Sequence, residues 1–213
     1  MVLRRNQKRD RCRNAMSRRS FLSGPGLGAA GAVVLDTAIP DLLGPPAQAA
    51  EPAHVGPGPI AVTLAVNGAL RSVSIEPNAT LTEVLRGPLD LTGTKLGCDR
   101  GACSACTVWL DRVPVASCMM LAIDVGDRKI TTIEGLARGE DLHPVQSAFI
   151  AHDAMQCGFC TPGLVMSCAA LVESNPTPSL DDVKAATSGH LCRCGAYPHV
   201  FAATLEAAKR GKT

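Results

Sequence analysis

The pattern of hydrophobic and polar residues changes period near the middle of the chain. Between residues 60 and 134, apolar residues occur in short alternating runs, which is the period of half-buried strands. After residue 141 they recur every three to four residues, which is the period of amphipathic helices. The pattern therefore predicts a strand-rich half followed by a helical half.

The strand-rich half predicts a small mixed sheet crossed by one helix. Asn67-Gly68 indicates a tight hairpin turn. The segment Thr80-Leu81-Thr82-Glu83 has the pattern of a capping box, which would open a short helix through Arg86. A glycine-rich loop, 93–101, follows the helix. Strands are expected at residues 60–66, 71–75, 107–110, 113–116 and 129–133.

The helical half predicts a bundle of four short helices. The first covers residues 142–152, and Thr161-Pro162 is typical of the N-cap and first-turn proline of a second, over 163–173. A third is expected after a Ser179 cap, and a fourth from Pro198 to about Lys209. With a Pro- and Gly-rich linker at 50–59, the fold class is α+β, with domains at 60–136 and 137–213.

The first 49 residues are typical of a bacterial export signal. Eight Lys and Arg residues within residues 1–23 precede an apolar stretch, 21–35. The segment Pro45-Pro46-Ala47-Gln48-Ala49-Ala50 then offers a cleavage site after Ala49. A membrane anchor is the alternative, but glycine and proline interrupt the apolar run before it reaches about 18 residues. No stable membrane span is therefore expected.

Within this leader, Ser17-Arg18-Arg19-Ser20-Phe21-Leu22 is similar to the twin-arginine motif, with Ser23 in place of its final Lys. The twin-arginine route exports folded proteins that often carry a cofactor. The motif therefore predicts a periplasmic protein that acquires its cofactor in the cytoplasm.

The distribution of charge argues against a nucleic-acid partner. The formal net charge of +2 comes from the leader, since residues 50–213 hold 13 basic and 16 acidic residues, a difference of −3. Aromatic residues make up only 3% of the chain, too few for a base-stacking platform. No basic face is predicted, and no nucleic-acid binding is expected.

Eight of the ten cysteines have the spacing of metal ligands. Cys98, Cys103 and Cys106 form C-x4-C-x2-C, and eleven residues separate Cys106 from Cys118, which is the spacing of plant-type [2Fe–2S] ferredoxins. Small neighbouring residues would let backbone N–H groups approach the cluster sulfurs. Zinc and disulfides are the alternatives, but zinc sites usually combine two C-x2–4-C units.

A second set joins C-x2-C at Cys157 and Cys160 with C-x-C at Cys192 and Cys194. The C-x2-C unit alone is equally typical of a redox dithiol or a zinc site, whereas C-x-C is harder to reconcile with zinc. Cys160 would precede a helix N-terminus, whose dipole stabilises a thiolate and an anionic cluster. This set therefore predicts a second cluster between two pairs of helices.

The remaining cysteines and the histidines are not expected to bind metal. Cys168 lies among apolar residues of a predicted helix and is interpreted as a small core residue, whereas Cys12 lies in the leader. The histidines are expected to be helix caps or surface residues: His143, His152, His190 and His199.

These motifs resemble the iron–sulfur subunits of the xanthine dehydrogenase/aldehyde oxidoreductase family of molybdenum hydroxylases. The resemblance covers nearly all of residues 60–210, with both cysteine sets in the same order. It is carried by GCDRGACSACTV (97–108), ITTIEGL (130–136), HPVQ (143–146), QCGFCTPG (156–163) and GHLCRCG (189–195). The leader is similar to that of the exported aldehyde-oxidising members.

The resemblance implies a ferredoxin-like β-grasp domain followed by an α-helical bundle domain, each holding one [2Fe–2S] cluster. It places the helical-domain cluster next to a molybdopterin held by a separate large subunit, with Gln156 and Cys194 at positions that contact the pterin. Electrons would then pass to an FAD-binding subunit or a cytochrome c acceptor.

Two departures from the family and one rival function bear on this interpretation. Ser104 replaces the glycine of most relatives, and it would donate to a cluster sulfur or tighten the loop. The 213 residues contain no flavin or molybdenum domain, so the chain is expected to carry electrons within an aldehyde- or N-heterocycle-oxidising complex and to have no catalytic residue. A stand-alone extracytoplasmic [2Fe–2S] carrier is the rival, although it would need no helical domain.

Overall fold

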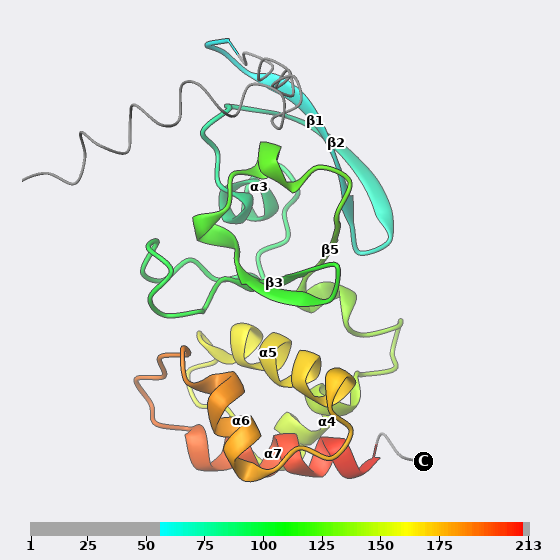
Figure 1. The fold of residues 1–213 in the computed structure, drawn as a ribbon, viewed down its shortest axis with the longest axis vertical. Coiled ribbons are helices and arrows are strands. Elements are labelled where there is room, and N and C mark those ends of the chain that lie inside the picture. The colour runs from blue at the N-terminus through cyan, green and yellow to red at the C-terminus, as the bar shows by residue number, and fades with distance from the viewer. Residues whose placement is uncertain (1–55, 211–213) are drawn as a thin grey trace, which may run out of the picture. The chain divides into compact units, whose positions relative to one another are not determined.

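The computed structural model describes residues 56–210, and the structural statements below concern these residues. The predicted export signal at 1–49 and part of the predicted linker lie outside them. The described chain contains a sheet-forming half and a helical half (Figure 1). Between residues 56 and 210, no helix combines the length and the apolar character needed to cross a bilayer.

A five-stranded mixed sheet forms the first half, in the order β2-β1-β5-β3-β4. The strands β1 (Ile60–Val66) and β2 (Ala69–Ile75) are antiparallel, whereas β1 and β5 (Lys129–Thr131) are parallel. On its other side β5 pairs with β3 (Thr107–Leu110), which pairs with β4 (Val113–Ala116). The predicted mixed sheet is confirmed, although β5 ends two residues early because the 3₁₀ turn η4 (Ile133–Gly135) follows it.

The helix α3 (Leu81–Arg86) covers this sheet and completes its core. Its capping box is present as predicted, since the Glu83 N–H donates to Thr80 Oγ1 and the Thr80 N–H to Glu83 Oε2. The 3₁₀ turn η3 (Ala122–Val125) also contributes buried residues to this core. It contains buried residues of these elements, including Leu64, Leu81, Val84, Leu85, Val108, Leu110 and Ile130.

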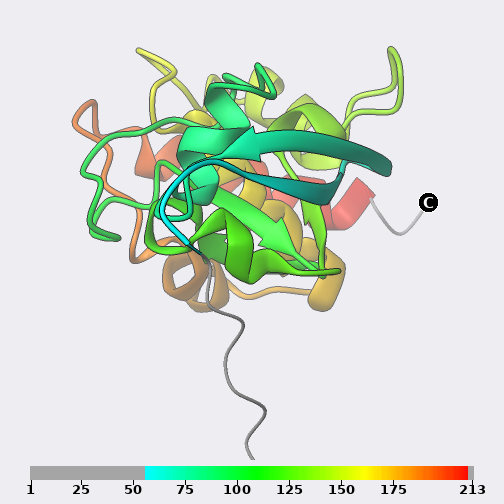
Figure 2. The same ribbon diagram turned by 90° about the horizontal axis from the view of Figure 1, so that it is seen from above.

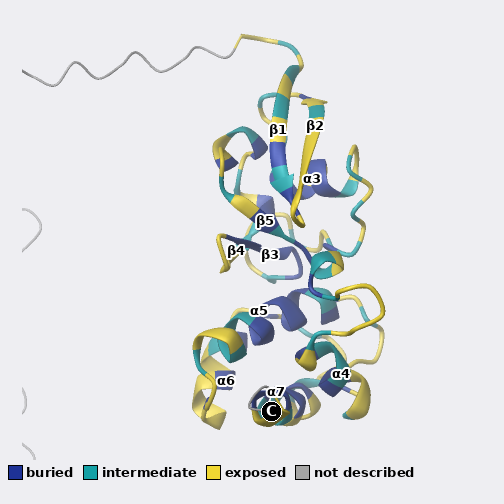
Figure 3. Ribbon diagram, turned by 90° about the vertical axis from the view of Figure 1, so that its right-hand side faces the viewer, coloured by how far each residue is buried: buried dark blue, intermediate teal, exposed yellow. Residues whose placement is uncertain are grey.

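Four helices form the second half: α4 (Pro144–Ala151), α5 (Thr161–Ser174), α6 (Leu180–Thr187) and α7 (Tyr197–Arg210). The predicted Ser179 cap is present, because Ser179 Oγ accepts the Asp182 N–H, and His143 caps α4 by accepting the Val145 N–H at Nδ1. The helix α5 is the most buried of the four (Figure 3). The predicted helical domain is confirmed.

The start of α5 differs from the prediction in a way that affects the cysteines. The N-cap is Cys160 and not Thr161, because the Leu164 N–H donates to the Cys160 carbonyl at 3.1 Å and so closes the first turn one residue earlier. Thr161 is the first helical residue and is buried. Cys160 is therefore fixed directly at the end of a helix.

The strand β3 links the two halves, because each of its faces is buried in a different core. Alternate residues of a strand point to opposite faces. Val108 and Leu110 face the sheet core, whereas Trp109 belongs to the core formed by α4, α5 and α7. Trp109 Nε1 donates to the Met166 carbonyl of α5 at 2.8 Å. Figure 2, seen from above, shows the strands lying over the helices.

Candidate metal centres

The first group of cysteines lies in the loop before β3 and in the 3₁₀ turn after β4. Cys98, Cys103 and Cys106 belong to the loop at 97–106, and Cys118 to η2 (Ser117–Met119). The loop reverses direction by left-handed backbone at three residues, with φ 52 at Asp99, 69 at Gly101 and 55 at Ser104. Cys106 and Cys118 are buried, whereas Cys98 and Cys103 are half-buried.

Ser117 joins the two segments that carry this group. Its N–H and its hydroxyl both donate to the Cys106 carbonyl, at 3.3 and 2.6 Å. Because the hydroxyl proton is used in this bond, Thr82 of α3 donates to Ser117 Oγ at 2.6 Å. The buried side of the cysteine group is thus anchored to the sheet and to α3. Sequence alone does not point to Ser117 and Thr82, because their partners lie 11 and 35 residues away along the chain.

The two sides of the first group differ in acidity. Hydrogen bonds, first from the backbone of Arg100 and then from Cys103 and the Ala102 N–H, lower the pKa of Cys98 to about 7. Burial, and to a smaller extent the adjacent Cys106, raise the pKa of Cys118 to about 11. The outer side therefore supplies a thiolate readily, whereas metal binding at the inner side must displace protons.

The second group lies in the two connections that precede α5 and α7. Cys157 and Cys160 come from the first connection, and Cys192 and Cys194 from the second. Cys157 and Cys194 are exposed, Cys192 is half-buried and Cys160 is buried. The ligand set is therefore assembled by helix packing, with one side open at the surface.

Acidity again differs across the second group. The backbone of Phe159, followed by the Cys194 side chain, lowers the pKa of Cys157. Burial raises the pKa of Cys160 to about 12, and Cys192 adds to this effect. The predicted stabilisation of a Cys160 thiolate by the helix N-terminus is therefore outweighed by burial.

In both groups the thiols interact as pairs, which fits a two-iron cluster. The neighbouring thiols that shift one another's pKa are Cys98 with Cys103, Cys106 with Cys118, Cys157 with Cys194 and Cys160 with Cys192. Between residues 56 and 210, no three Cys, His, Asp or Glu side chains converge on one metal-ion position. A [2Fe–2S] cluster needs four thiolates shared between two irons, and two thiol pairs provide this donor set.

The two cysteine groups touch each other through their loops. The Leu191 N–H, next to Cys192, donates to the Cys103 carbonyl at 3.2 Å. A Cβ on Gly163, in the first turn of α5, would lie 2.4 Å from the Ser104 carbonyl oxygen. A Cβ on Gly97 would lie 3.5 Å from the Phe159 ring. The main chain around one group therefore lies directly against the main chain around the other.

The other predicted site residues take varied positions. Gln156 and Cys194 are both exposed, as contact with a partner subunit requires. Ser104 Oγ lies 3.3 Å from the position of a Cβ on Gly189, so this hydroxyl faces the helical half. Cys168 is fully buried in the helical core, beside Thr204.

His190 corrects the expectation that all four histidines are caps or surface residues. It is 4% exposed, its Nε2 and Ser167 Oγ are 2.7 Å apart, and burial lowers its pKa to about 4. His143 and His152 agree with the expectation, because they cap the two ends of α4. Sequence could not reveal the burial of His190, because α5 supplies its partner from 23 residues away.

The fold and the paired cysteines define a two-domain protein of the [2Fe–2S] class, and comparison with known proteins agrees. The family model of the 2Fe-2S iron-sulfur cluster binding domain matches residues 64–130. The model of the [2Fe-2S] binding domain matches residues 132–205.

Known relatives narrow this class. The chain is 45% identical over 148 residues to the nicotine 6-hydroxylase small subunit of Paenarthrobacter nicotinovorans, covering 70% of this chain and 89% of the relative. It is 37% identical over 209 residues to the aldehyde oxidoreductase iron-sulfur-binding subunit PaoA of Escherichia coli K12, covering 91% of this chain and 89% of the relative. The chain belongs to the family of small iron–sulfur subunits of molybdenum hydroxylases.

A solved structure supports the same assignment. The quinoline 2-oxidoreductase of Pseudomonas putida 86 contains a chain that is 39% identical, with a TM-score of 0.67, over 73% of this chain and 99% of that one. The described residues therefore have the fold of such a subunit, and the chain is an electron-carrier subunit of an oxidoreductase complex.

Proposed function

We propose that this chain carries electrons from the molybdopterin site of a partner subunit to a flavin or cytochrome acceptor. Bound [2Fe–2S] clusters would each take up and release one electron at a time. The observation that carries the proposal is the gathering of eight cysteines into two groups of two thiol pairs, with the loops of the groups in contact.

The ligands proposed for the first cluster are Cys98, Cys103, Cys106 and Cys118, and those for the second are Cys157, Cys160, Cys192 and Cys194. In each group, buried thiols lie beside at least one thiol of lowered pKa. Hydrogen bonds from backbone N–H groups, such as that of Ala102 to Cys98 Sγ, compensate negative charge on sulfur.

A short route through covalent bonds and one hydrogen bond between the groups supports electron transfer within this chain. From Cys103 the route crosses one hydrogen bond, from the Leu191 N–H to the Cys103 carbonyl, and continues along the backbone to Cys192. Close contact of the two loops at Gly163 keeps this bond in place.

The open side of the second group supports a large molybdopterin-binding subunit as partner there. Cys157, Cys194 and Gln156 are exposed. Their sequence neighbours Met155, Phe159 and Leu191 are apolar yet 45%, 49% and 62% exposed. Exposed apolar side chains around a site are typical of a surface that a partner covers. We assign contact with the molybdopterin to Gln156 and Cys194.

The acceptor side is proposed at the first group, at an FAD-binding subunit or a cytochrome c. A stand-alone carrier remains the second candidate, because the Cys98 loop is itself exposed at Arg100 and Gly101. Affinity purification of the chain from its native cells distinguishes the two. Recovery with a molybdenum-containing subunit is expected, whereas recovery alone, with both clusters bound, would favour the carrier.

Metal analysis and spectroscopy test the ligand assignment. The purified chain should contain about four irons, two for each [2Fe–2S] cluster, and give two distinct paramagnetic signals after reduction. Tightly bound zinc without iron in freshly isolated protein would contradict the assignment.

We also propose export to the periplasm through the twin-arginine route. The motif at residues 17–22 supports this route. The alignment with PaoA covers 91% of the chain, which is more than residues 56–210, so it extends into the N-terminal segment. Replacing Arg18 and Arg19 together by Lys should leave the precursor in the cytoplasm with its iron in place. Normal periplasmic recovery of the double variant would rule out this route.

A further inference from the structure

In the loop between α6 and α7, three consecutive backbone N–H groups donate to oxygen acceptors and not to cysteine sulfurs. The His190 N–H donates to the Thr187 carbonyl at 3.0 Å, and the Leu191 N–H to the Cys103 carbonyl at 3.2 Å. The Cys192 N–H donates to the hydroxyl of Tyr197 at 2.8 Å. Two of these partners are backbone carbonyls, whereas the third is a side chain that can be changed without altering the main chain.

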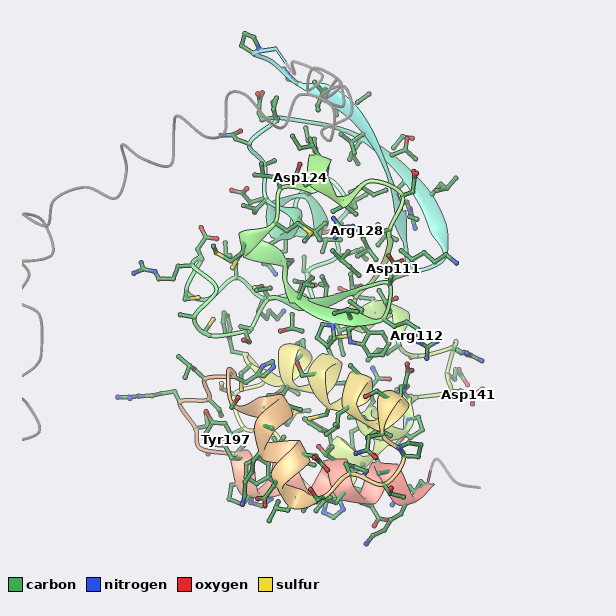
Figure 4. The ribbon with its side chains drawn as sticks, viewed as in Figure 1. Asp111, Arg112, Asp124, Arg128, Asp141 and Tyr197 are labelled. Atoms are coloured by element: carbon green, nitrogen blue, oxygen red, sulfur yellow. The ribbon has the colours of Figure 1, made fainter. Side chains whose placement is uncertain are left out.

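The Tyr197 hydroxyl holds this loop at two points. It accepts the Cys192 N–H and donates its own proton to the His190 carbonyl, also at 2.8 Å. Tyr197 is the first residue of α7 and the only tyrosine of the chain (Figure 4). Its half-buried ring lies 6.3 Å from that of Phe201, one turn further along the helix. The ring position is therefore fixed by α7.

The Cys192 thiol receives its hydrogen bonds from the other end of the loop. The backbone N–H groups of Ala196, Gly195 and Cys194, which follow it in the chain, lie within hydrogen-bonding reach of its sulfur. The N–H groups that follow Cys192 thus point to sulfur, whereas its own N–H is held by Tyr197. Some N–H groups of the loop therefore face the Cys192 sulfur, and others donate to oxygen acceptors.

We propose that Tyr197 is a positioning residue that keeps the Cys192 N–H away from the sulfurs of the second cluster and so holds the reduction potential of that cluster low. This inference rests on the proposed role of Cys192 as a cluster ligand. A hydrogen bond to sulfur stabilises the reduced cluster more than the oxidised one, because reduction adds negative charge. Each donor withheld from sulfur therefore lowers the potential.

Loss of the hydroxyl should act in one direction only. In Tyr197→Phe the Cys192 N–H loses its acceptor and becomes free to bond a sulfur or a water molecule. A bond to sulfur would raise the potential, whereas a bond to water would leave the N–H dipole in place. The expected shift is positive, because neither outcome lowers the potential.

The experiment is a redox titration of the intact complex, followed by the paramagnetic signals of the two clusters. The signal that is lost in Cys160→Ser identifies the second cluster. Tyr197→Phe should keep the wild-type iron content, shift the midpoint of this signal to a more positive potential and leave the other midpoint in place. No shift, or a negative shift, would overturn the inference.

Ser167→Ala provides a matched control. It removes the partner of the His190 side chain, 2.7 Å away, and loosens the same loop while the Cys192–Tyr197 bond stays. Its midpoint shift should be smaller than that of Tyr197→Phe. An equal shift in both variants would show that general loosening is responsible, which would also overturn the inference.

A gentler change keeps the test decisive should the Phe variant fail to assemble. Site-specific 3-fluorotyrosine at position 197 keeps the shape of the side chain but makes its oxygen a weaker acceptor. A smaller shift of the same sign is expected at a pH where the phenol is protonated, and an unchanged midpoint would refute the role. Wild-type protein that lacks iron would instead contradict the proposed function itself.

Discussion

The two cysteine groups each contain four thiols, but different levels of structure bring these thiols together. In the first, three cysteines lie within nine residues of one loop, and the fourth follows after a hairpin. In the second, the ligands come from two connections that are brought together only when α5, α6 and α7 pack. The first group is therefore arranged largely by local backbone geometry, and the second by tertiary structure. The two groups should respond differently to mutation.

The largest expected effect comes from removing one cysteine of each group. Cys103→Ser and Cys160→Ser should each lower the iron content from about four to about two per chain, and each should abolish a different paramagnetic signal. Metal analysis with spectroscopy of reduced samples measures both. Loss of both signals in the Cys103 variant would show that the first group does not form independently of the second.

Gly163→Ala tests the contact between the groups. The new Cβ would meet the Ser104 carbonyl oxygen at 2.4 Å, so helix and loop must move apart, at a cost of about 1–3 kcal/mol. Thermal loss of visible absorption should shift to lower temperature. Gly189→Ala is the control, because its Cβ would meet only the rotatable Ser104 hydroxyl at 3.3 Å. Equal destabilisation of the two variants would argue against a main-chain contact.

Cys168→Ala sharpens the distinction between ligand and core cysteines. Cys168 is fully buried in α5, so its loss should reduce stability by about 1 kcal/mol while the iron content stays unchanged. Denaturation midpoints and metal analysis on the same sample test both statements. A halved iron content would mean that the second group is wrongly assigned.

The smallest effect concerns pH and the cap of α4. Burial lowers the pKa of His143, although Glu173 beside it acts in the opposite direction. The unfolded chain therefore binds this proton first, and the contribution of His143 is present above its unfolded pKa, about 6.5, and is lost as the pH falls toward the folded pKa. His143→Asn keeps a capping oxygen without titrating, so its stability should fall less between neutral and mildly acidic pH. Identical pH profiles would contradict this.

The sequence predicted local features better than those that depend on packing. The capping box at Thr80, the cap at Ser179 and the hairpin at Asn67-Gly68 depend on neighbouring residues, and the structure contains them. The N-cap of α5 was predicted at Thr161, one residue late. Thr is common at the N-cap and Pro in the first turn, and this pattern does not distinguish Pro162 at the first helical position from Pro162 at the second.

Features that join distant segments could not be predicted in this way. The Trp109–Met166 bond spans 57 residues and the Ser117–Thr82 bond spans 35. The bond between Tyr197 and Cys192 spans only five, yet it requires the loop conformation that α5 and α7 impose. Cysteine spacing indicated the ligands but not the residues that hold them.

The burial of β3 on both faces has a consequence for how the protein unfolds. Neither half can keep Trp109 covered without the other, so the two should unfold in one cooperative transition. The exposed turn at 138–142 is the natural site for proteolysis. A chain cut there should still migrate as one particle under native conditions, and its fragments should separate only in denaturant.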